Sequence, residues 1–357
     1  MRQSALFTPL QIGAMTMKNR IVVPPMCQYQ AKDGLPTTWH HVHYGKLAGS
    51  GAGLVCIESV GVCAEGRITI GDLGLWNDEQ TSAFAELIKT MRAIDPEVKV
   101  MVQLSHSGRK GSHDLQWIGR LLSPQEGGWT VKAPSAIGAG GDYPIPEAMT
   151  EEEIDAVVEA YAQAAARAQQ AGVDSIQLHA AHGYLVHQFL SPISNQRDDE
   201  YGGCLENRMR MPIRVFEAMR KAAPNVVLGV RVSATDWIEG GWNEHDTVTF
   251  VNALKSFGCE FVDVSSGGLS EDQRLEVAYG YQLKYARIIK DGCKLPTFGV
   301  GLVKNAYQAE SAIVEGACDA IGVGRAMLLD PHWGWRAALE LGVQVQFPPS
   351  YRRGMYL

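Results

Sequence analysis

The sequence of 357 residues lacks the features that would place it in a membrane or on a nucleic acid. No apolar run approaches the roughly 18 residues that span a bilayer, and residues 1–10 hold no apolar core of a secretory signal. The 32 basic and 39 acidic residues give a net charge of -7, and lysine and arginine form no dense run. We therefore expect a cytoplasmic protein that acts on small molecules, not on nucleic acid or a membrane.

Cysteine is also sparse and poorly spaced for a structural role. The seven cysteines are odd in number and scattered, without a Cys-x-x-Cys pair, which predicts reduced thiols and excludes a disulfide framework or a thiolate zinc site. The content of 46% hydrophobic and 20% charged residues is that of a globular protein and excludes a fibre, a coiled coil or a disordered chain.

Eight β-rich runs alternate with helical patterns along the chain. Eight such units favour a parallel sheet closed into a (β/α)8 TIM barrel, which we expect as a single domain over residues 1–357. An open doubly wound sheet is the alternative, weakened because no Gly-x-Gly-x-x-Gly follows the first strand. The predicted strands cover residues 20–24, 53–58, 99–104, 174–179, 226–232, 261–265, 296–300 and 320–323.

Helices are predicted between these strands. A capping box at Thr150–Glu153 precedes an apolar stripe that begins at Ile154, typical of an amphipathic helix. Residues 105–149 are too many for an ordinary βα loop, and they are rich in glycine, proline and serine. We interpret them as an insertion after strand 3 that lies over the barrel mouth. Other predicted helices cover residues 207–223, 246–257, 282–290 and 305–315.

Strand alternation separates the side chains that face the helices from those that face the barrel interior. When the apolar set of each strand faces the helices, polar side chains are left facing inward near the carboxyl ends of five strands, where barrel enzymes hold their active sites. This pattern favours an active site over isolated structural polar groups. The inward residues are Cys56, Glu58, Gln103, Gln177, His179, Arg231, Asp263 and Ser265.

Glycines end the last two strands. Gly299-Val-Gly301 and Gly322-Val-Gly-Arg325 stand where barrels commonly bind phosphate through backbone N–H groups. Either stretch alone would be explained by a tight turn. Together with the charged donor Arg325 they predict a phosphate site.

His179 and His182 follow the fourth strand in a His-x-x-His pattern, with Tyr184 two residues on. Such a pair could bind a metal, but no third ligand has convincing spacing. We favour hydrogen-bond donation to a substrate oxygen, with Tyr184 as a proton donor, and predict no metal. The histidines of residues 39–43 are interpreted as surface groups at the start of a helix.

Many ordered motifs resemble the old yellow enzyme family of FMN-dependent ene-reductases, in its thermophilic-like class, over nearly the whole chain. Two departures occur: Ser105 replaces an alanine, and Met355 replaces an aromatic residue near the C-terminus. The motifs include Pro24-Pro-Met-Cys-Gln-Tyr29, Glu65-Gly-Arg-Ile68, Ser105-His-Ser-Gly-Arg-Lys110, His179-Ala-Ala-His-Gly-Tyr-Leu185, Phe189-Leu-Ser-Pro192, Arg231-Val-Ser233, Ser265-Ser-Gly-Gly268 and Tyr351-Arg-Arg-Gly354.

The resemblance implies an FMN in the barrel mouth. Its ring would be lined by four residues and hydrogen-bonded on the pyrimidine side by two more, and its phosphate would lie at the two glycine stretches. A cation beside the ring favours its reduced anion. The ring residues are Pro24, Met26, Cys27 and Gly61, the pyrimidine partners are Gln103 and Arg231, and the phosphate partners are Gly301, Gly324 and Arg325.

The same resemblance implies the reaction, an NADPH dehydrogenase or ene-reductase activity. NADPH or NADH would reduce FMN, which would then pass hydride to the β carbon of an activated alkene, an α,β-unsaturated carbonyl or nitro compound. His179 and His182 would hold the substrate oxygen, Tyr29 would form the pocket wall, and Tyr184 would protonate the α carbon. The alternative is a metal-dependent TIM-barrel hydrolase that uses the His179/His182 pair.

The C-terminal motif carries one further implication. In the resembling class a terminal arginine, Arg353 here, reaches the substrate site of the adjoining subunit. The resemblance therefore implies a homodimer or homotetramer in which Arg353 belongs to the neighbouring site.

Overall fold

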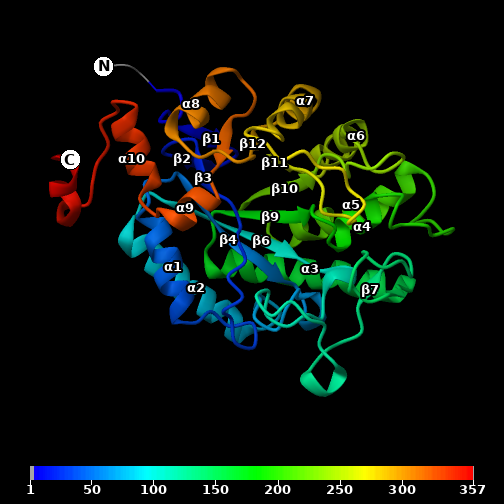
Figure 1. The fold of residues 1–357 in the computed structure, drawn as a ribbon. Helices are drawn as coiled ribbons and strands as arrows, with labels where there is room; N and C mark the ends of the chain where they lie inside the picture. Colours follow the sequence, from blue (N-terminus) through cyan, green and yellow to red (C-terminus); the bar gives the residue numbers. More distant parts are fainter. Residues whose placement is uncertain (1–3, 357) are drawn as a thin grey trace.

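The computed structural model describes residues 4–356, and eight parallel strands close into a barrel within them (Figure 1). Each strand pairs with the next along the chain, and the last pairs with the first. This closure confirms the predicted (β/α)8 barrel. Its strands are β3 (Ile21–Val23), β4 (Leu54–Gly61), β6 (Lys99–Ser105), β9 (Ser175–Ala180), β10 (Val227–Ser233), β11 (Val262–Ser265), β12 (Thr297–Gly299) and β13 (Ala320–Gly322).

Helices surround the barrel (Figure 1). The predicted capping box starts α3, where Thr150 Oγ1 accepts a hydrogen bond from the Glu153 N–H, and Gly172 ends it at φ 90°, a backbone conformation that favours glycine. The helices are α1 (Thr38–Ala48), α2 (Asp78–Ile94), α3 (Glu151–Ala171), α4 (Leu185–Leu190), α5 (Leu205–Ala222), α6 (Glu244–Lys255), α7 (Leu283–Cys293), α8 (Ala306–Val314), α9 (Arg325–Leu329) and α10 (Trp333–Glu340).

Two apolar cores hold the barrel. The larger lies between the outer strand faces and the helices. The smaller fills the barrel at the amino ends of its strands, where Phe261 and Phe298 stack with ring centroids 4.9 Å apart. A hairpin of β1 (Leu10–Ile12) and β2 (Met15–Met17) supplies side chains to this second core. The amino end is therefore closed, and the polar side chains gather at the carboxyl end.

One inward assignment was wrong. The pairing of β4 with β6 shifts between Ile57 and Ser59, and this bulge turns Glu58 toward α1. Glu58 there accepts a hydrogen bond from the Tyr44 hydroxyl at 3.1 Å and lies 3.4 Å from His40 Nε2. His40 is consequently buried, contrary to its interpretation as a surface group.

Shorter elements complete the chain. The segment between β6 and α3 carries η2 (Gly108–Lys110), η3 (Pro124–Glu126), β7 (Lys132–Ala133) and β8 (Glu147–Ala148), and part of it extends away from the barrel in Figure 1. The others are η1 (Ala64–Gly66), β5 (Leu73–Gly74) beside β4, and η4 (Pro349–Tyr356). Within residues 4–356, no helix combines the length and apolarity needed to cross a bilayer.

Candidate active site

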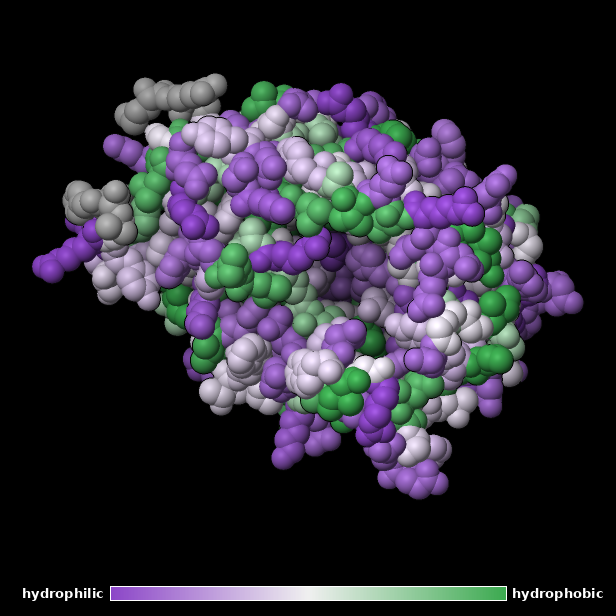
Figure 2. Space-filling view, in the orientation of Figure 1, coloured by the Kyte–Doolittle hydropathy of each residue, from purple (hydrophilic) through white to green (hydrophobic). Residues whose placement is uncertain are grey.

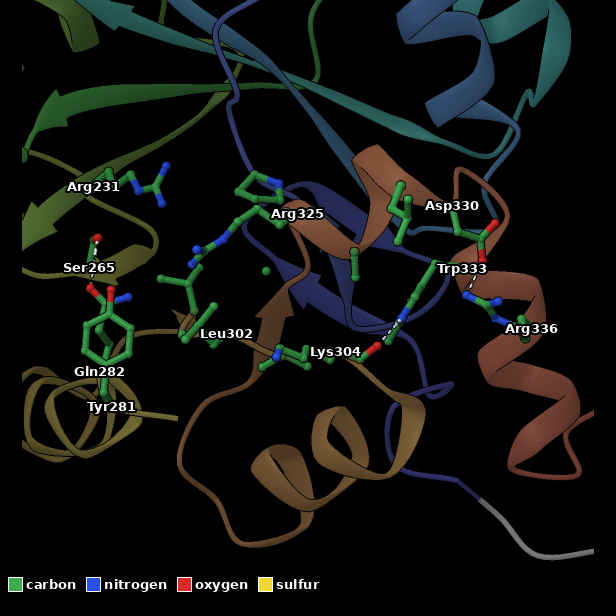
Figure 3. A pocket seen from close by; sticks show the side chains of 18 residues that line it. Arg231, Ser265, Tyr281, Gln282, Leu302, Lys304, Arg325, Asp330, Trp333 and Arg336 are labelled. Carbon is green, nitrogen blue, oxygen red and sulfur yellow. Dashed lines mark hydrogen bonds and ion pairs between the residues drawn. The ribbon is translucent and has the colours of Figure 1, made fainter. Parts of the chain in front are cut away.

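A cavity of about 570 Å³ opens at the carboxyl ends of the strands. Figure 2 shows a recess near the middle of this face, bordered by hydrophilic side chains. The residues around the cavity come from the end of β3, from β10 and β11, from the segments after β11, β12 and β13, and from α9 and α10. They include Pro24, Arg231, Ser265, Gln282, Gly301, Lys304, Gly324, Arg325, Trp333 and Arg336 (Figure 3).

A chain of buried polar side chains crosses the barrel interior below the cavity. Gln103 Nε2 donates to Gln177 Oε1 at 2.7 Å, and Gln177 Nε2 donates to Asp263 Oδ2 at 3.1 Å. Arg231 Nε lies 3.3 Å from the same carboxylate oxygen. These are side chains that strand alternation predicted to face inward, and the chain of contacts fixes the amide of Gln103 and the guanidinium of Arg231.

The glycines and Arg325 meet at one side of the cavity. Gly301 has φ 143°, a conformation that side chains with a Cβ rarely adopt. In Figure 3 the guanidinium groups of Arg231 and Arg325 both point into the space between them. A Cβ on Gly324 would lie 3.3 Å from Met26 Sδ and 3.4 Å from Pro24 Cγ. The absence of a side chain there lets the segments that follow β3 and β13 lie close together at the cavity wall.

Cys27 and Tyr29 follow β3 on the way to α1. Burial, followed by the Glu58 and Asp72 carboxylates, raises the pKa of the Cys27 thiol. Tyr29 has φ 53°, a left-handed conformation that turns the chain. Gly61 ends β4 and is paired with Ser105 at the end of β6.

His179, His182 and Tyr184 converge at the end of β9. The ring centroids of His179 and His182 are 5.1 Å apart, and those of His179 and Tyr184 are 4.9 Å apart. Burial, followed by the charge of Arg231, lowers the pKa of both imidazoles well below the usual value. Burial raises the pKa of the Tyr184 phenol. All three groups are therefore neutral at physiological pH.

Two side chains beside this cluster had no role in the sequence interpretation. Lys110 Nζ donates to the His182 carbonyl at 3.1 Å and lies 6.0 Å from the Tyr184 ring centroid. Ser265 Oγ lies 3.2 Å from Gln282 Oε1 and 2.7 Å from His182 Nε2, within hydrogen-bond distance of both. Lys110 is the last residue of the Ser105–Lys110 motif, so the sequence did indicate that it could belong to the site. Gln282 stands where a helix was predicted to begin, so nothing in its sequence position indicated a role in the site.

The residues present fit the FMN that the resemblance implies. Arg231 Nε faces the Asp263 carboxylate at 3.3 Å, whereas its guanidinium points into the cavity (Figure 3), so its terminal N–H groups are placed to donate to a ligand. Arg325 and the glycine-lined wall suit a phosphate, which backbone N–H groups and a guanidinium bind well. The cavity is also within the volume range of cofactor sites.

Arg353 lies elsewhere in this single chain. It is exposed on η4, a segment at the edge of the molecule in Figure 1. The Tyr351 ring of this segment packs 5.9 Å from the Trp335 ring of α10. Five of the other predicted site residues line the cavity, and the rest do not, although His182 contacts the lining residue Ser265. The five are Pro24, Arg231, Gly301, Gly324 and Arg325; the others are Met26, Cys27, Tyr29, Gly61, Gln103, His179, His182 and Tyr184.

Known proteins match the chain over almost its full length. The family model described as the NADH:flavin oxidoreductase / NADH oxidase family matches residues 5–343. An NADPH dehydrogenase of Geobacillus thermodenitrificans (strain NG80-2) is 39% identical over 353 residues, which cover 98% of each chain.

Solved structures give the same result. Morphinone reductase in complex with tetrahydroNAD has a TM-score of 0.79 at 26% identity and covers 97% of this chain and 93% of its own. The old yellow enzyme homologue from Zymomonas mobilis has a TM-score of 0.79 at 27% identity and covers 96% of this chain and 94% of its own.

The hydrolase alternative finds no support in these matches. Across the described range 4–356, no group of three His, Cys, Asp or Glu side chains is arranged to hold a metal ion. The matched family and the similar proteins instead support a flavin and a nicotinamide as cofactors. The chain belongs to the NADH:flavin oxidoreductase / NADH oxidase family and is an FMN-dependent NADPH oxidoreductase of the old yellow enzyme type.

Proposed function

We propose that the protein reduces the C=C bond of activated alkenes, meaning α,β-unsaturated carbonyl or nitro compounds. The observation that carries this proposal is the convergence of His179, His182 and Tyr184, three neutral donors, at the end of β9 beside the cavity. The printed names of relatives, NADPH dehydrogenase and morphinone reductase, support a nicotinamide donor and a small-molecule substrate.

The two imidazoles bind the electron-withdrawing oxygen of the substrate. His179 Nδ1 accepts the Ala181 N–H at 3.3 Å, so its proton is on Nε2, which can donate. The one proton of the Ser265 hydroxyl has two acceptors within reach, Gln282 Oε1 at 3.2 Å and His182 Nε2 at 2.7 Å. We assign it to the shorter contact, so that the N–H of His182 is on Nδ1 and is free for the substrate. Both donors are aimed at the oxygen where negative charge develops during reduction, which stabilises the transition state.

Tyr184 donates the proton to the α carbon. Its raised pKa keeps the phenol protonated at neutral pH, and its position is fixed because α4 starts at the next residue, where the Leu185 N–H donates to the His106 carbonyl at 2.9 Å. When bound, FMN supplies the hydride that NADPH delivers to it.

The remaining residues hold the cofactor and shape the pocket in this proposal. Four line the ring, two bond its pyrimidine side, three bind the phosphate, and one forms the pocket wall. In that order they are Pro24, Met26, Cys27 and Gly61; Gln103 and Arg231; Gly301, Gly324 and Arg325; and Tyr29.

The test replaces both imidazoles. His179→Ala combined with His182→Ala should weaken binding of p-hydroxybenzaldehyde by at least roughly tenfold, because two donors are lost, and should reduce enone turnover while FMN stays bound. The flavin spectrum reports both ligand and cofactor. The exposed His245 offers a matched control, His245→Ala, which should bind as the wild type. Unchanged affinity in the double variant, or release of a bound metal, would refute the donor role.

A further inference from the structure

His182 and Tyr184 are presented by a tight left-handed turn after β9. His182 has φ 59° and Gly183 has φ 74°, and a non-glycine residue persists in this region only when its surroundings hold it there. Four side chains bond the backbone groups of these two residues. Ser233 Oγ accepts from His182 N (2.9 Å), Lys110 Nζ donates to His182 O (3.1 Å), His187 Nδ1 accepts from Gly183 N (2.9 Å), and Gln188 Nε2 donates to Gly183 O (2.7 Å).

His187 is the one member of this set whose role depends on where its proton lies. Because Nδ1 accepts the Gly183 N–H, Nδ1 carries no proton, and the neutral ring must be protonated on Nε2. His187 Nε2 lies 2.9 Å from Asp236 Oδ1, and both side chains are fully buried. Asp236 follows β10 and has no part in the proposed reaction, so this buried pair is unexplained by the chemistry.

The second carboxylate oxygen of Asp236, Oδ2, accepts hydrogen bonds from two other groups. Asp236 Oδ2 accepts the backbone N–H of Trp242 at 2.8 Å and the hydroxyl of Ser191 at 2.6 Å. A backbone N–H can only donate. An atom in the Oδ2 position must therefore remain an acceptor, whatever side chain occupies this residue.

We propose that Asp236 fixes the tautomer of His187, and that His187 in turn holds the turn that aims His182 and Tyr184 at the substrate. His187 and Asp236 are thus positioning residues, not catalytic ones. The proposal rests on the proposed function for the roles of His182 and Tyr184, but the tautomer of His187 can be measured without any substrate.

Asp236→Asn tests the proposal with almost no change in shape. The Trp242 N–H forces the amide oxygen of the new side chain into the Oδ2 position, so its NH2 group faces His187 Nε2. Two donors cannot face each other, so His187 must move its proton to Nδ1, where it meets the Gly183 N–H. The turn then loses its acceptor, although the fold keeps every other contact.

The first readout is the His187 ring itself. Solid-state ¹⁵N NMR of histidine-labelled holoenzyme, assigned by difference from the His187→Asn spectrum, should show a proton on Nε2 in the wild type and on Nδ1 in Asp236→Asn. Ser191→Ala is the matched control, because it removes a partner of the same carboxylate but leaves Oδ1 facing His187. Its tautomer should be that of the wild type. A wild-type proton on Nδ1 would overturn the proposal outright.

The second readout is a double-mutant cycle on binding of p-hydroxybenzaldehyde to the holoenzyme. Asp236→Asn should weaken binding by roughly tenfold, the usual scale for a buried group left without its partner, and should raise KM for 2-cyclohexenone. His187→Asn keeps an acceptor near Gly183 N, so adding Asp236→Asn in that background should cost little further affinity. Additive losses, or equal losses in Ser191→Ala, would mean that Asp236 only supports the fold.

A variant that does not fold still leaves the proposal testable. If Asp236→Asn does not accumulate with FMN, His187→Asn and His187→Leu are compared. Asn should bind the phenol several-fold more tightly than Leu because it retains the acceptor, and equal binding would overturn the proposal. Failure of the proposed function is a separate result, because it would appear as wild-type protein that neither binds the phenol nor reduces the enone.

Discussion

His179 and His182 acquire their chemistry from burial at the end of β9, beside the charges of Arg231 and Lys110. Each of these influences disfavours the imidazolium and lowers the pKa. The imidazoles therefore stay neutral as the pH falls from about 8 to about 6, because they would gain a proton only well below their usual value of about 6.5.

This protonation state predicts a flat pH profile. KM for 2-cyclohexenone, which does not ionise, should be constant between about pH 6 and pH 8, because neither substrate donor titrates there. Steady-state kinetics with NADPH held saturating provide the measurement. A KM that changes with an apparent protein pKa near 6.5 would show that at least one imidazole is charged in the working enzyme.

Tyr184 gives a second prediction at this scale. Tyr184→Phe removes the phenolic proton and should slow enone reduction by about 10² to 10⁴-fold, the usual contribution of a positioned general acid. Reduction of the enzyme by NADPH needs no proton at carbon and should be nearly unaffected. Stopped-flow kinetics separate the two half-reactions. Equal slowing of both would remove Tyr184 from the role of acid.

At the scale of elements, the hairpin of β1 and β2 is a plug for the amino end of the barrel. Ile12, Met15 and Met17 are buried in the lower core, whereas Thr16 between them is exposed. The hairpin lies at the end opposite the cavity, so it should affect stability and not cofactor binding.

Met17→Ala tests this separation. Loss of a buried methionine should lower the free energy of unfolding by about 2 to 5 kcal/mol, with an unchanged FMN affinity in the surviving folded protein. Thr16→Ala on the same strand should change stability by less than about 0.5 kcal/mol. Denaturant titration and FMN fluorescence give the two values. A Met17→Ala variant as stable as Thr16→Ala would show that the hairpin does not stabilise the amino end of the barrel.

The barrel strands were predictable because each alternates apolar and polar residues or forms a short apolar run. The same alternation placed Gln103, Gln177, Arg231 and Asp263 in the interior, where their contacts now form one chain. The alternation fails at Glu58, because one extra residue in a strand reverses the faces beyond it. A bulge of this kind leaves no mark in the sequence.

Other features depend on contacts between distant segments. The strands of the hairpin are three residues each, too short to show a period. The turn at His182 is held by side chains from residues 110, 187, 188 and 233, and their meeting is decided by barrel closure. Sequence alone could name His182 and Tyr184 but not what holds them.

At the scale of the whole molecule, we propose a homodimer or homotetramer in which Arg353 completes the neighbouring subunit's site. The exposure of Arg353 on η4, at the edge of the single chain, supports this. A guanidinium that has no use within its own subunit's cavity is available to a partner.

Deletion of Tyr351–Leu357 tests the shared site. The truncated protein should show a raised KM for enones and an unchanged FMN affinity, because the phosphate-binding residues are not removed. Arg353→Ala should reproduce the KM change, whereas Arg287→Ala on α7, another exposed arginine, should not. Analytical ultracentrifugation gives the assembly state. A fully active monomer, or a truncated enzyme with wild-type kinetics, would refute the shared site.

Anaerobic reduction and reoxidation of the holoenzyme test most directly whether the protein passes electrons from NADPH through FMN to an activated alkene. The protein reconstituted with FMN should absorb in the blue, bleach when NADPH is added, and regain its absorption when 2-cyclohexenone is added, with cyclohexanone as the product. A protein that retains no FMN after reconstitution, or a bleached enzyme that the enone leaves unchanged, would contradict the account.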